Sequence, residues 1–320
     1  MEQVKRVIGK ELAEFEKKFG ESVKGSNPLL DRVMRFIIKR KGKQMRPMFV
    51  FLSAQIAGGI NDSTYRAASL IELLHTATLV HDDVVDNALI RRNFFSINAL
   101  WKNKIAVLVG DYLLSKGLLL ALGNEDYQIL QITSRAVKEM AEGELLQMEK
   151  ARKLDIKEDI YFEIIRAKTA SLLSAACSAG AWSATASKEV AESFRLFGEK
   201  VGIAFQIKDD LFDYGEANVG KPTGIDIKEK KMTLPLIYTL LQAEKEVKRK
   251  IIYIVKNQNT NKQKVKEVIQ YVHQYGGIEY AAAKMMEYKK DALSILHSFP
   301  QSPARDAMEE LVNYVIDRKY

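Results

Sequence analysis

The segment IELLHTATLVHDDVVD, residues 71–86, joins a run of apolar residues to three aspartates, Asp82, Asp83 and Asp86. The apolar residues recur at helical spacing, which predicts one long amphipathic helix from Ser63 to about Asn87. In a helix, Asp82 and Asp86 lie one turn apart on the same face, where like charges are destabilising. Asp83 lies about 100° round the axis and adds to the same negative field. Alone, the segment fits either a solvated helix end, which is the simpler interpretation, or a site that binds a cation.

Helical patterns continue through the rest of the 320-residue chain. The chain has 47% hydrophobic residues, 6 Pro and 18 Gly, and it has few alternating runs of β-branched residues, so we expect an all-α fold. No repeat of fixed period and no linker interrupts the pattern, which predicts one large helical bundle and a single domain over residues 1–320. After two helices that include Val4–Phe19 and Pro28–Arg40 and a third that begins at Met48, helices are expected near 63–87, 95–122, 126–150, 157–185, 188–214, 233–247, 262–273, 277–296 and 303–318.

Composition and charge narrow the functional classes. The net charge of +8 is spread along the chain, and no nucleic-acid-binding signature accompanies it, so nucleic acid is not the expected partner. The single cysteine, Cys177, excludes an internal disulfide and suits core packing in a reducing compartment. We expect a cytoplasmic protein, because the N-terminus lacks an export signal. The apolar run that starts at Ile105 contains Asp111 and Lys116, which favours a buried helix over a membrane span.

A second acidic cluster repeats the spacing of the first. The segment FQIKDDLFD, residues 205–213, contains Asp209, Asp210 and Asp213 and also ends an apolar helical run. A glycine-rich loop with Lys221 follows it. Two such clusters, each followed by basic residues, are poorly explained as solvated helix ends. Carboxylate oxygens suit Mg²⁺, which shares its coordination shell with substrate phosphates. The two clusters therefore predict a diphosphate held through bridging magnesium ions.

Several further motifs occur in an order typical of one enzyme family. They are GKQMRP from Gly42, IELLHTATLVHDDVVDNALIRR, VGDYLLSKG from Val109, RAKTASL from Arg166, FQIKDDLFD, the GKP-x-G-x-D loop and KKMTLPLIY from Lys230. Together they resemble the trans-isoprenyl diphosphate synthases (polyprenyl synthetases), in particular the long-chain, octaprenyl-synthase-like branch. The resemblance covers roughly Gly42 to Tyr238. Asn93 and Lys230 depart from it, because the family usually has glycine at both positions.

The resemblance implies a fold and an activity. The fold is the helical bundle of the isoprenoid synthases, arranged around a central cavity. The activity is the Mg²⁺-dependent, head-to-tail condensation of isopentenyl diphosphate with an allylic diphosphate, to give a long all-trans product of the octaprenyl class that suits a quinone side chain. A shorter farnesyl or geranylgeranyl product is the alternative. The family also implies a homodimer, and release of the product suggests a peripheral contact with the membrane.

The resemblance further assigns site residues. Asp82, Asp86 and Asp209 are expected to bind magnesium directly, and Asp83, Asp210 and Asp213 to support the metals directly or through water. Arg91 is expected to hold the allylic diphosphate, together with Lys168, Lys221 and Lys231. The expected ligands of isopentenyl diphosphate are Lys43, Arg46, His75 and Arg92. Lys168, Thr169 and Gln206 are expected to line the path of the allylic cation. His75 is assigned by the motif alone, since a histidine within a helix is more often structural, and His81 is either a supporting residue or merely exposed.

Chain length and the competing functions depend on a few positions. Ala77 and Thr78 lie about one turn before Asp82, where short-chain members place bulky aromatic residues, so a long product is expected. The simpler interpretation is that these small residues allow close helix packing. A terpene cyclase would share the fold, but its second metal motif usually contains Ser/Thr and Glu. A non-catalytic subunit would generally lose the aspartates, and a head-to-head coupling enzyme would need NADPH and different acidic motifs.

Overall fold

The computed structural model describes residues 1–25, 27–39, 42, 44–91, 94–151, 154, 157–215 and 223–317. The chain forms two compact units. The first contains Met1–Val137, Leu172–Arg195 and Phe299–Glu310, and the second contains Lys138–Ser171, Leu196–Ser298 and Leu311–Tyr320. The prediction of a single domain over residues 1–320 stays a prediction.

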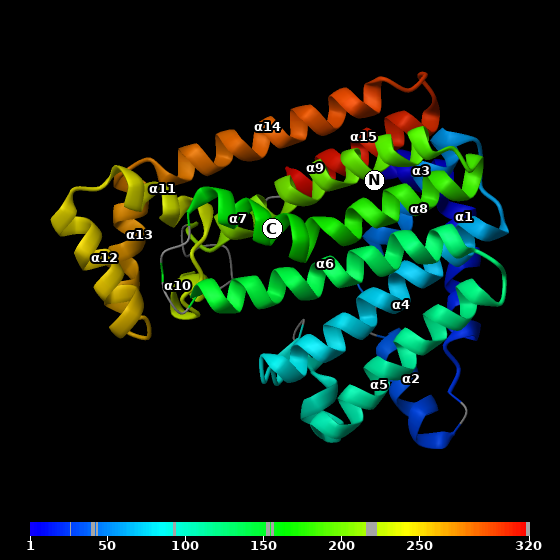
Figure 1. Ribbon diagram of the computed structural model, residues 1–320, viewed down its shortest axis with the longest axis horizontal. Helices are drawn as coiled ribbons and strands as arrows, with labels where there is room; N and C mark the ends of the chain where they lie inside the picture. Colours follow the sequence, from blue (N-terminus) through cyan, green and yellow to red (C-terminus); the bar gives the residue numbers. More distant parts are fainter. Residues whose placement is uncertain are drawn as a thin grey trace. The chain divides into compact units, whose positions relative to one another are not determined.

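The described elements are almost all helices, which confirms the all-α prediction (Figure 1). In chain order they are α1 (Glu2–Ser22), α2 (Pro28–Lys39), α3 (Met45–Ala57), α4 (Asp62–Val85), β1 (Ile90–Arg91), β2 (Phe94–Phe95), α5 (Ile97–Leu122), α6 (Tyr127–Ala151), α7 (Glu158–Ile165), the π-helical turn η1 (Arg166–Ala170), α8 (Ser171–Thr185), α9 (Lys188–Phe212), α10 (Ile225–Lys228), α11 (Leu234–Gln242), α12 (Lys245–Asn257), α13 (Lys262–Gln274), α14 (Gly277–His297) and α15 (Pro303–Ile316). Strands β1 and β2 pair antiparallel in a short hairpin that the sequence did not predict.

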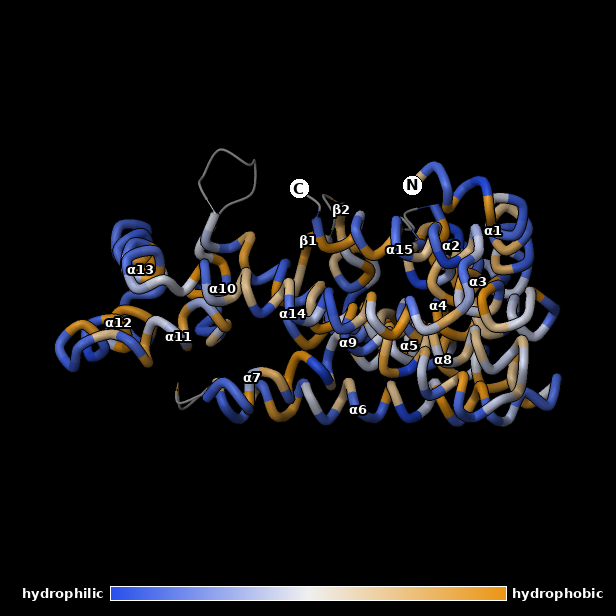
Figure 2. Tube along the Cα trace, turned by 90° about the horizontal axis from the view of Figure 1, so that it is seen from above, coloured by the Kyte–Doolittle hydropathy of each residue, from blue (hydrophilic) through white to orange (hydrophobic). Residues whose placement is uncertain are grey.

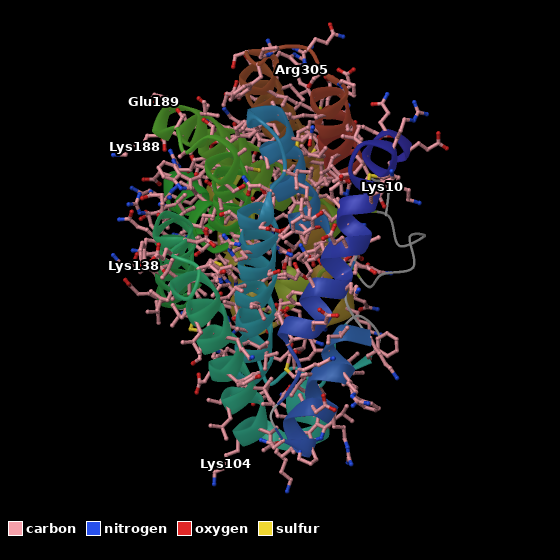
Figure 3. The ribbon with its side chains drawn as sticks, turned by 90° about the vertical axis from the view of Figure 1, so that its right-hand side faces the viewer. Lys10, Lys104, Lys138, Lys188, Glu189 and Arg305 are labelled. Carbon is pink, nitrogen blue, oxygen red and sulfur yellow. The ribbon has the colours of Figure 1, made fainter. Side chains whose placement is uncertain are left out.

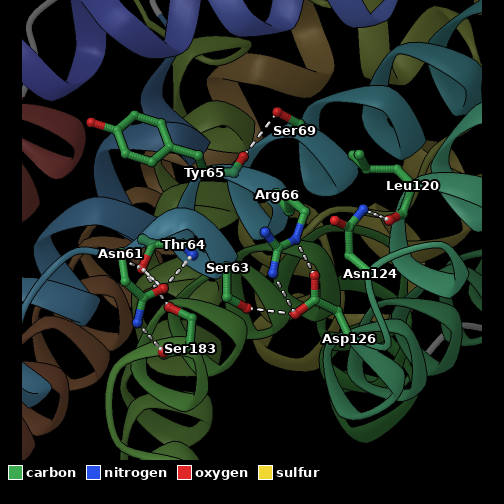
Figure 4. Close-up of polar contacts among 10 residues, drawn as sticks. All are labelled: Asn61, Ser63, Thr64, Tyr65, Arg66, Ser69, Leu120, Asn124, Asp126 and Ser183. Atoms are coloured by element: carbon green, nitrogen blue, oxygen red, sulfur yellow. Dashed lines mark hydrogen bonds and ion pairs between the residues drawn. The ribbon is translucent and has the colours of Figure 1, made fainter.

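Helix α4, which carries the first aspartate cluster, has a well-defined start. Asn61 caps it, because its side-chain oxygen accepts the backbone N–H of Thr64 at 3.1 Å, while the Thr64 hydroxyl accepts the N–H of Asn61 at 3.2 Å. One turn further on, Arg66 forms an ion pair with Asp126, and the Ser63 hydroxyl donates to the same carboxylate at 2.6 Å (Figure 4). The contacts with Asp126 attach the start of α4 to the residue before α6. The cap at Asn61 provides an acceptor for a backbone N–H group that has no partner within the helix.

Helices α4 and α5 lie side by side in the first unit (Figure 1). Gly117 of α5 allows this close approach, because a Cβ there would lie 2.8 Å from a methyl group of Leu70. The core next to α4 is aromatic, with the ring centroids of Phe51 and Tyr65 5.1 Å apart and those of Phe15 and Phe51 5.9 Å apart. This packing holds α4 rigidly in the first unit.

The prediction of a buried helix from Ile105 is wrong for most of α5. Only 33% of its most apolar window is buried, and Leu108 and Leu119 are 60% and 67% exposed. Of the described helices, α5 is long and apolar enough to cross a membrane by length and composition, but core helices of soluble proteins meet that criterion as well. Much of the apolar surface of α5 is therefore exposed in this chain instead of buried in a core.

The second unit contains helices whose apolar and polar faces are clearly separated. Helix α12 buries Ile251, Ile254 and Val255, and α13 buries Val265, Val268 and Val272. Orange and blue segments alternate along these helices in Figure 2, as expected for amphipathic helices. The charged run from Ala243 to Val268 predicts two solvated helices joined by the polar segment NQNTNKQ, residues 257–263, and α12 and α13 confirm it. The helix predicted over 233–247 is instead two helices, since α11 ends at Gln242 and α12 begins at Lys245.

The basic charge lies on solvent-exposed side chains in many helices. Lys104, Lys138 and Lys188 belong to α5, α6 and α9, and their side chains point away from the helices around them (Figure 3). The net positive charge is thus not collected in one patch of these helices, which agrees with its even spread along the sequence.

Candidate functional site

The first aspartate cluster ends helix α4. Asp83 is buried, Asp82 is half-buried and Asp86, which caps the helix, is exposed. The backbone carbonyl of Asp83 accepts the Asn98 side-chain amide at 3.1 Å, which attaches the end of α4 to α5. The C-terminal end of a helix carries partial negative charge, so carboxylates there are unfavourable unless a cation is present. Asp82 and Asp86 therefore stay candidate ligands for a cation.

A cavity of about 180 Å³ lies beside the first cluster within the first unit. Its polar wall contains Arg46, Glu72, His75 and Asp83, and its apolar wall includes Phe36. The structure thus brings together two of the residues expected to hold isopentenyl diphosphate, Arg46 from the GKQMRP segment and His75 from α4. Since the cavity combines a cation with apolar side chains, it suits a small ligand with an anionic head and an apolar end.

The second aspartate cluster ends helix α9, and its three members differ in their contacts. Asp210 is buried, and its two oxygens accept the hydroxyl of Tyr161 at 2.6 Å and the side-chain N–H of Gln206 at 2.8 Å. Asp213 accepts the backbone N–H groups of Ile225 and Asp226 at 2.8 and 3.0 Å. Asp209 is half-buried on the same helical turn. The repeated spacing of the sequence therefore conceals three different environments.

Lys168 and Thr169 are carried by the π-helical turn η1 between α7 and α8, where the sequence predicted one continuous helix over 157–185. Glycines on two neighbouring helices allow this wider turn. A Cβ at Gly143 of α6 would lie 2.8 Å from the Cβ of Ala167, and one at Gly202 of α9 would lie 2.5 Å from the Cα of Ala170. Single π-helical turns occur frequently at functional sites. Here the turn places both Lys168 and Thr169 in the wall of a second cavity.

That cavity, of about 220 Å³, lies wholly in the second unit. The predicted residues that line it are Lys168, Thr169, Gln206, Asp210 and Lys231, and they are joined by Gln147, Tyr161 and Asp226. The two lysines are held by acidic or amide groups. Lys168 pairs with Glu144 and donates to Gln147 at 3.3 Å, and the ammonium group of Lys231 lies 2.6 Å from Glu229 and 3.9 Å from Asp226.

The carboxylates around the second cavity repel one another. Burial raises the pKa of Asp210 to about 7, and the charges of Asp226 and Asp209 add to the effect. Burial also raises the pKa of Asp226 to about 6, with a further contribution from Asp213. Among the described residues, no three His, Cys, Asp or Glu side chains could hold a metal ion by themselves. Mg²⁺ needs only one or two carboxylates beside water and phosphate oxygens, so the donor set fits such an ion.

Several predicted site residues are not assembled by the described part of the chain. Lys43, Arg92 and Lys221 lie outside the described residues, and Arg91 is described only as part of strand β1. His81 is half-buried beside α5, where its ring nitrogen lies 3.2 Å from the carbonyl oxygen of Val107 and 3.5 Å from a carboxylate oxygen of Asp111. It is therefore not merely exposed.

The chain-length positions lie in the last turns of α4. Ala77 is fully buried, and the hydroxyl of the half-buried Thr78 donates to the carbonyl of His75 at 2.9 Å. Neither position lines the two cavities described above.

Sequence reasoning gave no role to Tyr161, Gln147 or Asp226. Asp226 closes the GKP-x-G-x-D loop, so the motif itself was the signal that could have identified it. Tyr161 belongs to no motif quoted above, and it meets Asp210 across 49 residues of sequence. Only the fold reveals that contact.

Comparisons with known proteins identify the family of the chain. A sequence profile of the polyprenyl synthetase family matches residues 27–272. The chain is 35% identical to an all-trans-nonaprenyl-diphosphate synthase (geranyl-diphosphate specific) of Rhodobacter capsulatus, over 97% of this chain and 96% of that protein. It is 32% identical to a short chain isoprenyl diphosphate synthase of Methanothermobacter thermautotrophicus, over 100% of both chains.

Solved structures show the same fold. A polyprenyl synthase from Caulobacter crescentus, complexed with calcium and isoprenyl diphosphate, superposes with a TM-score of 0.91 at 30% identity, covering 100% of this chain and 98% of that one. The family profile and the full-length relatives lead to one assignment. The chain belongs to the polyprenyl synthetase family and is a trans-polyprenyl diphosphate synthase, a prenyltransferase.

Proposed function

We propose that this enzyme adds isopentenyl diphosphate units head to tail to an allylic diphosphate, with Mg²⁺ as its metal. The observation that carries the proposal is the pair of acidic clusters that end α4 and α9, each beside a cavity with basic side chains. The Caulobacter structure, which contains calcium and isoprenyl diphosphate, supports a divalent cation. Asp82, Asp86 and Asp209 would hold the magnesium ions, which when bound would neutralise charge on the departing diphosphate.

The reaction needs no side-chain nucleophile. The bond between the allylic carbon and the diphosphate oxygen breaks, and its electron pair leaves with the diphosphate. The double bond of isopentenyl diphosphate then supplies two electrons for the new carbon–carbon bond. Loss of a proton, which the released diphosphate accepts, restores a double bond in the product. Thr169 and Gln206 line the second cavity and would face the allylic cation with their oxygen atoms.

The basic residues divide between the two substrates. Arg46 and His75 line the first cavity, and we assign them, with Lys43 and Arg92, to the diphosphate of isopentenyl diphosphate. Lys168 and Lys231 line the second cavity, and we assign them, with Arg91 and Lys221, to the allylic diphosphate. Arginine suits the first task because its planar guanidinium group binds phosphate through two parallel hydrogen bonds.

One experiment tests both activity and metal. The purified chain is incubated with isopentenyl diphosphate, farnesyl diphosphate and Mg²⁺, and the products are measured by mass spectrometry. We expect a series of products that differ by one five-carbon unit. Turnover should stop on chelation and return when Mg²⁺ is added. A metal-free enzyme that kept its turnover would contradict the proposal.

We propose a long all-trans product of the octaprenyl class, suited to a quinone side chain. The support is the small size of Ala77 and Thr78 next to the first cluster. The names of the relatives include both nonaprenyl and short chain products, so the family assignment leaves the length open. The same mass measurement decides it. A wild-type product that ended at farnesyl or geranylgeranyl diphosphate would overturn this part of the proposal.

We also propose a homodimer in which α5 meets α5 of a second copy. Leu108 and Leu119 are eleven residues apart, so they share one helical face, and both are largely exposed in the single chain. Leu118 and Leu122 extend this apolar face toward the end of the helix. Leu119→Glu should convert a dimer to a monomer in light scattering. A monomeric wild type with full turnover would contradict the dimer.

The hairpin β1–β2 supports a peripheral membrane contact. Leu89, Ile90, Phe94 and Phe95 are each at least half exposed, and Arg91 and Arg92 lie between them in the sequence. Apolar side chains beside basic ones suit an anionic bilayer surface, and a long polyprenyl diphosphate is itself an amphiphile. The protein should sediment with vesicles that contain phosphatidylglycerol. A Phe94→Ser, Phe95→Ser variant that sedimented equally well would exclude the hairpin as the contact.

A further inference from the structure

Four side chains in the second cavity form one continuous chain of hydrogen bonds. The Thr169 hydroxyl donates to the side-chain oxygen of Gln206 at 2.8 Å, and the side-chain N–H of Gln206 donates to Asp210 at 2.8 Å. The hydroxyl of Tyr161 donates to the other oxygen of Asp210 at 2.6 Å. All four residues belong to the second unit and line the same cavity.

Asp210 is the fixed point of this chain of hydrogen bonds. It is 6% exposed and Tyr161 is 3% exposed, so both groups are removed from solvent. Each oxygen of the carboxylate already accepts a short hydrogen bond from a protein group. Burying these polar groups costs little only because they satisfy one another. Asp209, one residue earlier, is half-buried. Asp210, the middle aspartate of the second cluster, is therefore buried and held by hydrogen bonds to both of its carboxylate oxygens.

The chain of hydrogen bonds has a direction. Asp210 accepts the side-chain N–H of Gln206, so the Gln206 amide turns its nitrogen toward Asp210 and its oxygen toward Thr169. The Thr169 proton then points at Gln206, and the remaining lone pairs of the Thr169 oxygen are left for other partners. If Asp210 moved, the Gln206 amide could rotate and present its N–H groups, which carry positive partial charge. That orientation would oppose formation of an allylic cation in the cavity.

We propose that Tyr161 is a positioning residue for the condensation reaction and that Asp210 anchors Gln206 and Thr169 instead of binding metal. The inference rests on the proposed function, because it assumes that an allylic cation forms beside these two residues. Tyr161 acts through Asp210: its hydroxyl holds the carboxylate in place, and the carboxylate fixes the oxygen atoms of Gln206 and Thr169. It should therefore affect the rate of ionisation and not the binding of either diphosphate or of Mg²⁺.

The first test is Tyr161→Phe, which removes only the hydroxyl group. We expect kcat to fall by about 10- to 100-fold, the loss typical of one hydrogen bond to a charged group. The KM values for both substrates and the Mg²⁺ concentration for half-maximal activity should stay within about twofold of wild type. Tyr253→Phe, at an exposed position, is the matched control and should have wild-type kinetics. An unchanged kcat in Tyr161→Phe, or a loss in KM alone, would overturn the proposal.

The second test separates an anchor from a metal ligand. In Asp210→Asn, the amide can still accept from Gln206 and can donate to the hydroxyl oxygen of Tyr161, so much of the anchor persists. Its half-maximal Mg²⁺ concentration should stay near the wild-type value, whereas Asp209→Asn should raise it about tenfold or more. Equal shifts in the two variants would show that Asp210 binds metal.

The double variant Tyr161→Phe, Asp210→Asn tests whether Tyr161 acts through Asp210. Residues that act as a unit lose activity non-additively, so the kcat of the double variant should match that of the worse single variant. A loss equal to the product of the two single losses would show that the residues act independently and would contradict the proposal. Turnover of isopentenyl diphosphate by the wild type tests the proposed function, whereas differences among active variants test the anchor, so the two failures are distinguishable.

Discussion

The aspartates differ in what their removal should cost. Asp209 and Asp82 are half-buried, and both are assigned to the metal, whereas Asp210 and Asp213 accept hydrogen bonds from Tyr161 and the start of α10. In Asp209→Ala or Asp82→Ala, kcat should fall by about 100- to 1,000-fold, as when one electrostatic partner of a transition state is removed. The melting temperature should change little, because mutual repulsion among the carboxylates is relieved. Asp159→Ala, at an exposed position on α7, is the control. A variant at Asp209 with near-normal kcat would refute the metal assignment.

Arg46 should act on one substrate only. It lines the first cavity with His75, and Lys168 and Lys231, assigned to the leaving diphosphate, line the second cavity instead. Arg46→Ala should raise the KM for isopentenyl diphosphate by about 10- to 100-fold, since a charge-assisted hydrogen bond is lost. The KM for the allylic substrate should stay within about twofold, and Arg135→Ala on the exposed side of α6 should leave both unchanged. Equal increases for the two substrates would contradict the assignment.

At single residues, the sequence reveals types and spacing but not partners. The two D-D-x-x-D clusters could be found because like charges at that spacing need a cation. The different contacts of the aspartates within the second cluster could not be predicted. Asp210 accepts a hydrogen bond from Tyr161 of α7, and Asp213 accepts hydrogen bonds from the start of α10. Those contacts depend on how distant segments pack, and no local pattern encodes them.

Helix ends are predictable where local chemistry sets them. The residues SNP at 26–28 predict a cap at Ser26 or Asn27 with Pro28 in the first turn, and the side-chain oxygen of Asn27 accepts the backbone N–H of Leu30 at 3.0 Å. The π-helical turn η1 was not predictable, because its wider geometry depends on the approach of α6 and α9 at Gly143 and Gly202. The split between α11 and α12 was missed for the opposite reason. The helical spacing continues through Ala243, and only the backbone turns there.

The close approach at Gly202 provides a prediction for the element as a whole. In Gly202→Ala the new Cβ would lie 2.5 Å from the Cα of Ala170, so α9 or η1 must shift. We expect the free energy of unfolding to fall by about 1–3 kcal/mol, and kcat to fall because Thr169 moves with η1. Gly20→Ala is the control, since nothing lies within 4 Å of its new Cβ, and alanine should stabilise α1 by up to about 1 kcal/mol. Denaturant titration and steady-state kinetics measure both. Wild-type stability and kinetics in Gly202→Ala would show that the turn does not depend on this contact.

The folded protein shields its single thiol, as the assignment of Cys177 to core packing predicted. Cys177 is fully buried, and burial raises its pKa to about 12. The thiol therefore stays protonated, and hence unreactive, at every pH below that value while the protein is folded. At pH 8 a thiol reagent should react with folded protein far more slowly than with protein in denaturant. An exposed cysteine introduced by Ser294→Cys should react at once. Fast reaction of the folded wild type would mean that the core around Cys177 opens readily.

Product length is also a property of the whole molecule, because a growing chain must find room in the protein at every cycle. Ala77 and Thr78 lie about 6–7.5 Å from Asp82 along α4, and neither side chain is large enough to stop an isoprenoid tail. Deeper in the same helix, Leu74 and Ile71 are buried and would border the apolar path that we expect the tail to take. In Ala77→Phe, the ring should block that path while the aspartates that bind the metal are untouched.

We therefore expect Ala77→Phe to give shorter products by mass spectrometry with continued consumption of isopentenyl diphosphate. Ala77 is fully buried, so phenylalanine could instead disturb the packing of α4. Thr78→Tyr is the second variant, because Thr78 is only half-buried and a larger side chain is accommodated there at lower cost. Leu100→Phe, at an exposed position on α5, should leave the product unchanged. If folded, active variants at both Ala77 and Thr78 made products of wild-type length, the small residues would serve helix packing alone, and the limit on chain length would lie elsewhere in the protein.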